Sequence, residues 1–215
     1  MTAHTMPGGS TTSLSVVLPR GYYELPLDTI HEAVESAESI VEFLPTEVAD
    51  VFPEVATAIA DLLTVLRANN ACYCAIGQHA AADGTPVTSW LTISLLDRGR
   101  AQNPRVTIAE LATEKATDGR DAHIEPVELG GRTVLFIEST TTYAVVDDSS
   151  RAESPGRAVH QIEAIVVADD GARIAVAVLS TADVAYGSDF GAMMVLLAGS
   201  ITFDTVVHPQ FTLAL

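Results

Sequence analysis

The order of apolar and polar residues changes its period several times along this chain. Alternation over residues 14 to 18 predicts a short strand, and a Pro-Arg-Gly turn then leads into a second strand at 22 to 26. From 28 to 68, apolar residues recur at spacings of three and four, which predicts two helices separated by Pro45. We therefore expect this segment to form a helical pair.

Apolar and polar residues alternate again after residue 70, and this pattern predicts a series of hairpins. The first spans residues 71 to 96 and the second spans 127 to 138. The clearest hairpin spans 162 to 180, where Asp169-Asp170-Gly171 forms a turn suited to positive φ. One face of this last hairpin is expected to carry Ile162, Ala164, Val166, Ile174, Val176 and Val178.

Two shorter helices are expected among these strands. Ile108 marks the inner side of a helix that begins after Pro104, and its solvent side is expected to carry Glu110, Glu114 and Lys115. The other helix precedes a last strand at residues 201 to 207. Its inner face is expected to carry Phe190, Met193, Met194 and Leu197.

These elements predict an α+β fold, in which helices pack on a mostly antiparallel sheet of seven to nine strands and the helical pair at 28–68 is an insertion. Residues 1–12 are small and polar and are expected to form a flexible N-terminal tail. Residues 13–215 are expected to form a single domain, because their length suits one domain of generous size.

Two parts of the chain resemble the PsbP-like α/β superfamily, which includes photosystem subunits, small bacterial lipoproteins and Ran-binding proteins. The resemblance lies in the opening Val-Leu-Pro-Arg-Gly-Tyr at 17–22, in the late hairpin, and in the closing segment from Phe190 to Phe203. It covers residues 14–26 and 131–204 at most. The chain differs from the whole superfamily in its helical insert, and from the lipoproteins in lacking a signal peptide and a lipobox cysteine. The resemblance implies a noncatalytic binding or assembly role.

The net charge of the chain limits the classes of partner that we expect it to bind. The 215 residues carry 28 acidic and 11 basic side chains, a formal net charge of −17, although 48% of the residues are hydrophobic. This charge repels phosphate groups, so we expect neither nucleic acid nor an anionic membrane as a partner. The first residues lack a basic segment followed by a long apolar run, and we expect a cytoplasmic protein.

Pairs of reactive side chains recur without completing a known catalytic or metal-binding set. Cys72 and Cys74 are expected to share one face of a strand as two buried thiols. His123-Ile124-Glu125 has the spacing of a zinc deaminase motif, but no downstream Cys-x-x-Cys follows it. His160 and Glu163 are expected to be surface residues on opposite faces of a strand. We therefore predict no catalytic residue, no metal site and no cofactor.

The strongest signal is a run of acidic residues in the helical pair. No Lys or Arg occurs between Arg20 and Arg67, although ten carboxylates do. Like charges at helical spacing cost a few tenths of a kcal/mol per pair, so an acidic stripe calls for an explanation. It is a solvated face that maintains solubility, a surface for a basic partner, or a cation site. The predicted partner-binding residues are Glu32, Glu35, Glu38, Glu42, Glu47, Asp50, Glu54 and Asp61.

Two functions from different classes follow from these observations. The first is a noncatalytic protein-binding adaptor or assembly subunit, whose acidic helical surface meets a protein partner with a basic patch. The second is a hydrolase or transferase whose active site is dispersed along the sequence. The sequence also leaves homo-oligomerisation open.

Overall fold

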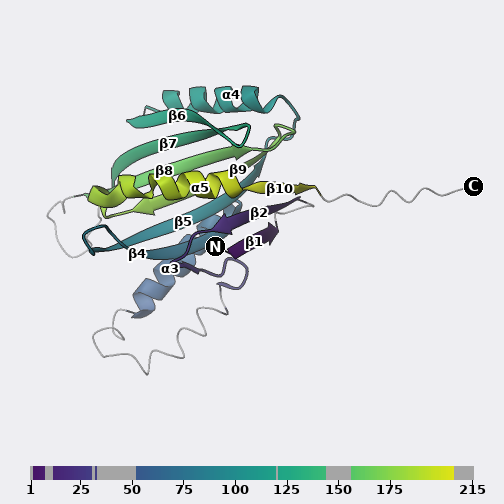
Figure 1. Cartoon of the computed structure of the whole chain (residues 1–215). Coiled ribbons are helices and arrows are strands. Elements are labelled where there is room, and N and C mark those ends of the chain that lie inside the picture. Colours follow the sequence, from purple (N-terminus) through teal and green to yellow (C-terminus); the bar gives the residue numbers. More distant parts are fainter. Residues whose placement is uncertain are drawn as a thin grey trace, which may run out of the picture.

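The computed structural model describes residues 2–7, 12–30, 32, 52–119, 121–143 and 156–205. Their strands form two antiparallel sheets and confirm the α+β class (Figure 1). The main sheet has seven strands in the order β3-β4-β5-β9-β8-β7-β6. They are β3 (Tyr22–Glu24), β4 (Ala71–Ala80), β5 (Pro86–Asp97), β6 (Ala122–Leu129), β7 (Arg132–Tyr143), β8 (Arg157–Val167) and β9 (Arg173–Thr181).

The second sheet is small and has the order β1-β2-β10. It joins the two ends of the described chain, since β2 (Thr12–Leu18) pairs with both β1 (Thr2–Pro7) and β10 (Thr202–Thr205). At residues 2–7, the structure therefore differs from the expectation of a flexible tail over residues 1–12. A strand at the edge of a sheet is held through its backbone and needs no apolar period of its own, so β1 gives no signal in the sequence.

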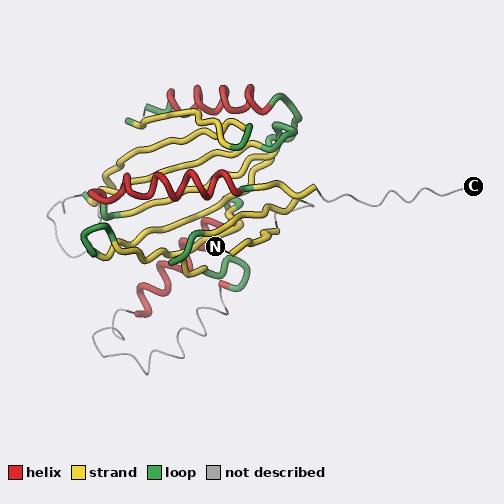
Figure 2. The backbone as a smooth tube through the Cα atoms, viewed as in Figure 1, coloured by secondary structure: helices red, strands yellow, loops and turns green. Residues whose placement is uncertain are grey.

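The small sheet and one helix cover the front face of the main sheet. That helix is α5 (Gly191–Ser200), preceded directly by the 3₁₀ helix η2 (Val184–Phe190). Figure 2 shows α5 in front of the strands on this side, running roughly along them. The core between the layers is apolar and nearly free of solvent. Its fully buried members include Leu14, Val16, Leu91, Ile93, Leu179, Met194, Leu197 and Ile201.

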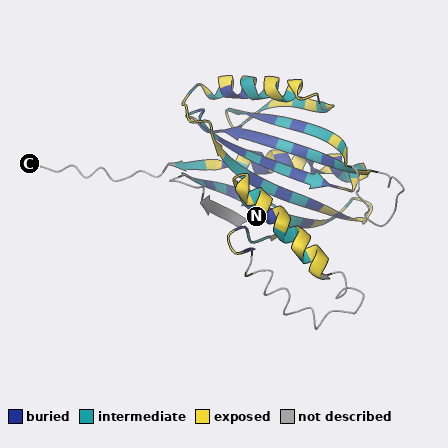
Figure 3. Ribbon diagram, turned by 180° about the vertical axis from the view of Figure 1, so that it is seen from behind, coloured by how far each residue is buried: buried dark blue, intermediate teal, exposed yellow. Residues whose placement is uncertain are grey.

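Two helices cover opposite ends of the back face. Helix α4 (Pro104–Thr117) packs over β6, β7 and β8, with Ile108 against Leu135 and Ile165. Helix α3 (Phe52–Ala68) packs over β4, where Leu63 joins a small cluster with Cys74 and the only tryptophan, Trp90. The back view in Figure 3 shows both helices, with the central strands between them.

Each predicted hairpin is present, but the residues that share one face of the last hairpin differ from the predicted set. Val166 pairs with Ala175 and Ala164 with Ala177, so even-numbered positions of β8 lie opposite odd-numbered positions of β9. Ala175, Ala177 and Leu179 therefore share the front face with Ile162, Ala164 and Val166, while Ile174 and Val176 lie on the back. The predicted face was therefore one residue out of register on β9, because the length of the turn decides how β8 and β9 pair.

Helix α4 occupies its predicted position, with a correction at one side chain. Asn103 caps its start by accepting a hydrogen bond from the Arg105 N–H. Lys115 does not simply face solvent, because its Nζ lies 2.8 Å from both carboxylate oxygens of Glu163 on β8. This ion pair ties the last turn of α4 to the back of the sheet, and Glu163 is only 14% exposed.

The turn of the late hairpin holds Gly171 at a φ of +69°. A Cβ at this position would clash with the Gln102 carbonyl oxygen, whereas a Cβ on Gly84, also at positive φ, would meet nothing within 4 Å. Gly171→Ala should therefore lower the free energy of unfolding by about 3 kcal/mol, against about 1 kcal/mol for Gly84→Ala, because only the first adds a clash with backbone. Denaturant unfolding of both variants measures this difference. Equal losses would show that Gln102 moves aside without cost.

Candidate functional site

The structure describes three of the eight predicted partner-binding residues. Glu32, Glu54 and Asp61 are all exposed, and the last two lie seven residues apart on α3. A separation of seven residues is two helical turns, so both carboxylates lie along one side of the helix. The other predicted residues lie outside the described part of the chain: Glu35, Glu38, Glu42, Glu47 and Asp50.

Helix α3 is attached to the sheet along a narrow face. Leu63 is 3% exposed, and Ile59 and Leu66 are partly buried beside it. At the end of the helix, Arg67 Nη1 donates to the Leu27 carbonyl oxygen at 3.1 Å, and Arg67 Nη2 lies 3.7 Å from the Asp28 carboxylate. The attachment therefore combines a small apolar cluster with one Arg at the C-terminal turn.

Next to this attachment face, the exposed side of α3 carries an apolar stripe. Val55 and Leu62 belong to the apolar residues at helical spacing that the sequence shows over 28–68, but in the structure Val55 is 51% exposed and Leu62 is 40% exposed. Val65 lies on the same stripe and is 57% exposed. Positions 55, 62 and 65 repeat at helical spacing, and Glu54 and Asp61 lie along the edge of this stripe. Figure 3 shows most of α3 in the colour of exposed residues.

The two cysteines do not share a face of β4. The pairing with β5 shifts between Ala71 and Tyr73, and this irregularity leaves Cys72 as an extra residue. Cys72 consequently packs against the front core, while Cys74 is fully buried at the back under α3. Burial raises the pKa of each thiol to about 11, so both are protonated at neutral pH.

The two histidine motifs have different outcomes. His123 is exposed on β6, 3.6 Å from the Glu125 carboxylate. His160 was expected at the surface but is buried, and its Nδ1 lies 3.3 Å from the Thr140 hydroxyl. Its Nε2 lies 3.2 Å from Glu138 Oε1, but the two are too poorly aligned for a hydrogen bond. His160 is buried because Gly187 of η2 packs directly on its ring.

A hydrogen-bonded set that the sequence analysis missed lies on the front face of the β4–β5 hairpin. Ser89 Oγ lies 3.2 Å from His79 Nε2 and 3.0 Å from Tyr22 Oη. The three side chains meet over Gly77, where a Cβ would come within 2.7 Å of each. Gly77 pairs with Ser89 across the hairpin, and the absence of a side chain there makes the space for this set.

A Ser–His pair at this distance resembles an activated nucleophile, but its burial argues against that role. Ser89 is 0% exposed, so no substrate atom reaches its Oγ. Burial raises the pKa of Tyr22 to about 12 and lowers the pKa of His79, so both are neutral at pH 7. The set therefore fixes the orientation of the His79 ring rather than supplying a nucleophile.

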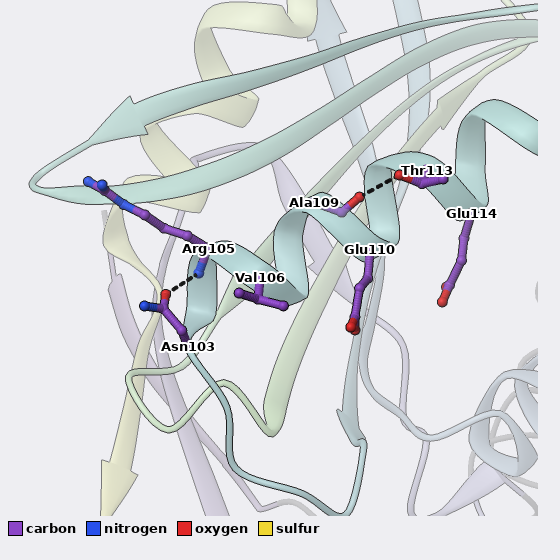
Figure 4. Close-up of a pocket in the computed structure, with 7 residues that line it drawn as sticks. All are labelled: Asn103, Arg105, Val106, Ala109, Glu110, Thr113 and Glu114. Carbon is purple, nitrogen blue, oxygen red and sulfur yellow. Dashed lines mark hydrogen bonds between the residues drawn. The ribbon is translucent and has the colours of Figure 1, made fainter.

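One hollow lies on the outer surface of α4 and has a volume of about 580 Å³. Figure 4 shows that its lining side chains all come from α4 and its cap. Of its two carboxylates, Glu110 is already engaged by Gln102 at 3.0 Å, and by Arg98 and Arg100 at 3.7 and 3.5 Å. A hollow with a wall from one helix encloses little of a ligand, so it is a weak candidate for a binding site.

Within the described residues, no group of three or more His, Cys, Asp or Glu is placed to hold a metal ion. None of the helices described is long and apolar enough to cross a membrane. Comparison with protein-family models and with curated protein sequences returns no match. The resemblance to the PsbP-like superfamily therefore stays a prediction.

The positions of the two thiols predict their reactivity. In native protein, alkylation of either cysteine by iodoacetamide should be slower than after unfolding and should rise about tenfold per pH unit without a plateau below pH 10, because the thiolate is the reactive form. Cys74→Ala, which keeps the partly exposed Cys72, should react faster than Cys72→Ala. Mass spectrometry of timed samples measures both rates.

The same variants test for a metal site. Purified protein should contain no stoichiometric zinc, iron or copper, because the two thiols lie on opposite faces of the sheet. Stoichiometric metal that disappears when either cysteine is replaced would contradict this assignment.

Proposed function

We propose that this chain is a noncatalytic protein-binding adaptor or assembly subunit, and that α3 is the centre of its contact surface. The observation that carries the proposal is the exposed stripe of Val55, Leu62 and Val65 with Glu54 and Asp61 at its edge. A helix that joins its own core by one narrow face and leaves the adjoining apolar residues exposed is typical of a partner-binding element.

The apolar stripe favours a contact surface over a purely solubilising one. Acidic residues alone would serve solubility, but exposed Val and Leu at helical spacing reduce it. Of the large hydrophobic residues exposed in the described part of the chain, three lie together on this helix. Burial in a partner would remove this apolar area from water, at about 25 cal/mol per Å².

The negative charge of α3 and of the whole chain supports a partner with a basic surface. Apart from Arg67 at its last turn, α3 carries no basic residue, and its first turn carries Glu54. The whole chain has a net charge of −17. The complementary surface is an apolar groove with Lys and Arg at its rim, into which α3 inserts Leu62 and Val65. Carboxylates at such a rim mainly set the association rate and its dependence on salt.

The experiment combines site-specific crosslinking with charge reversal in the native source. A photo-crosslinking amino acid at position 62 should capture a protein with a basic, apolar groove. The same amino acid at Leu196, which is 62% exposed on α5, should not capture it. Glu54→Lys together with Asp61→Lys should weaken the captured partner at least about tenfold, while the melting temperature changes little because exposed charges contribute little to stability.

The control is a second pair of reversals at the opposite edge of the sheet, Asp121→Lys and Glu125→Lys, which removes the same charge from exposed positions. This pair should leave the affinity within about twofold, since charges farther apart than a Debye length are largely screened. Unchanged affinity of the α3 variant across a salt series would contradict the proposal. Crosslinks only between copies of the chain, with a dimer in size-exclusion chromatography, would replace the adaptor by a homo-oligomer.

A further inference from the structure

A second cavity, of about 510 Å³, lies between the turn of the β4–β5 hairpin and the start of α5. Its volume is in the range that holds a small ligand. Unlike the hollow on α4, it has walls from two segments a hundred residues apart. Its lining residues are His79, Ala80, Ala81, Ala82, Val87, Tyr186, Asp189, Phe190 and Met193.

The two walls are held together by hydrogen bonds at the rim. The Tyr186 hydroxyl donates to the Asp83 carboxylate at 2.9 Å and lies 3.3 Å from the Thr85 hydroxyl. Beside them, the Thr88 N–H donates to Asp183 Oδ2 at 3.0 Å. The cavity is therefore formed before a ligand arrives, which reduces the entropy lost on binding.

The inner wall is built from aromatic rings in fixed orientations. His79 lies edge-on to Phe190, with ring centroids 5.2 Å apart, and its ring is 5.0 Å from that of Tyr22. The buried Ser89 fixes His79 from behind, and Tyr22 Oη also lies 3.8 Å from Met193 Sδ. Two cavity-lining residues, His79 and Met193, are thus joined through buried polar groups.

The charge at this cavity is negative. Asp189 lines it, and none of the described lining residues is Lys or Arg. Hydrogen bonds from Thr85 and Tyr186 lower the pKa of the neighbouring Asp83, so that carboxylate is ionised at neutral pH, whereas burial leaves His79 neutral. The start of α5 is not an open anion site, because η2 runs directly into it and the Gly191 N–H donates to the Ser188 carbonyl oxygen.

We propose that this cavity binds a small organic cation with an apolar body, such as an alkylammonium or arylammonium compound. Aromatic faces attract cations through their quadrupole, and a nearby carboxylate adds to the attraction. Met193, Val87 and the alanines contact the apolar part. The site is independent of α3, which lies on the opposite face of the sheet.

The test uses benzyltrimethylammonium as the probe, with benzyl alcohol and benzoate as its neutral and anionic counterparts. An NMR titration of isotope-labelled protein at low salt follows the resonances of the His79 ring and the Met193 methyl group. The resonance of the Trp90 indole, on the back face, serves as an internal control. Benzyltrimethylammonium should shift the cavity signals saturably, with a Kd at least about threefold lower than that of benzyl alcohol. Benzoate should bind most weakly.

Two variants separate charge from aromatic attraction. Asp189→Asn removes an exposed carboxylate and should weaken the cation about threefold without affecting benzyl alcohol. Phe190→Leu keeps an apolar wall and should also weaken the cation more than the alcohol. Glu125→Gln, at the far edge of the sheet, should change neither, and circular dichroism verifies that each variant is folded.

Three outcomes would overturn the proposal. Benzoate binding as tightly as the cation would refute the charge assignment. Equal affinities in wild type, Asp189→Asn and Phe190→Leu would place the probe elsewhere. Absence of saturable shifts at the cavity up to the solubility limit of all three probes would show that it is not a ligand site.

Discussion

The packing of α5 on the centre of the main sheet is the contact on which the rest of the structure depends. Ala164 and Ala177 pair across β8 and β9 and are fully buried, as are Met194 and Leu197 of the helix. Small side chains on the strands leave room for large ones on the helix, so the two layers pack closely. Because η2 leads directly into α5, this packing also fixes the positions of Tyr186 and Phe190.

The two proposed sites differ in how firmly they are held. The cavity beside His79 lies at the edge of the front core, and hydrogen bonds at its rim hold its two walls together. Helix α3 contacts the sheet through Leu63 and its neighbours at β4, far from α5. Local opening is easier where few apolar contacts hold an element, and partner-binding segments are often of this kind. The fold thus combines a preformed cavity with a loosely attached helix.

Most of the elements were predictable because their signals are local. Alternation of apolar residues indicated the hairpins, and Asp170-Gly171 marked a turn that the structure confirms at positive φ. The errors came from pairing between strands. The irregularity before Tyr73 separated the two cysteines, and the register of the late hairpin moved Ile174 to the other face. Such features depend on the partner strand, so one segment read alone does not reveal them.

The candidate sites could be predicted only in part for the same reason, since they depend on contacts between segments. The acidic run was visible as composition, but its edge of exposed Val and Leu was not, because burial on α3 depends on how the helix meets β4. His79 and Ser89 are ten residues apart and lie diagonally across the hairpin, so only the β4–β5 register brings them together. Gly77, opposite Ser89, was the one local signal, since a glycine inside a strand often marks a close approach of other groups.

The position of Trp90 has a spectroscopic consequence. It is the only tryptophan in the chain, and it packs in the cluster beneath α3 on the back of the sheet. Intrinsic fluorescence excited at the indole band is consequently a local signal of how α3 sits on β4, whereas far-UV circular dichroism averages over both sheets. Where the two signals disagree during denaturation, the indole has recorded the release of one helix from an otherwise intact molecule.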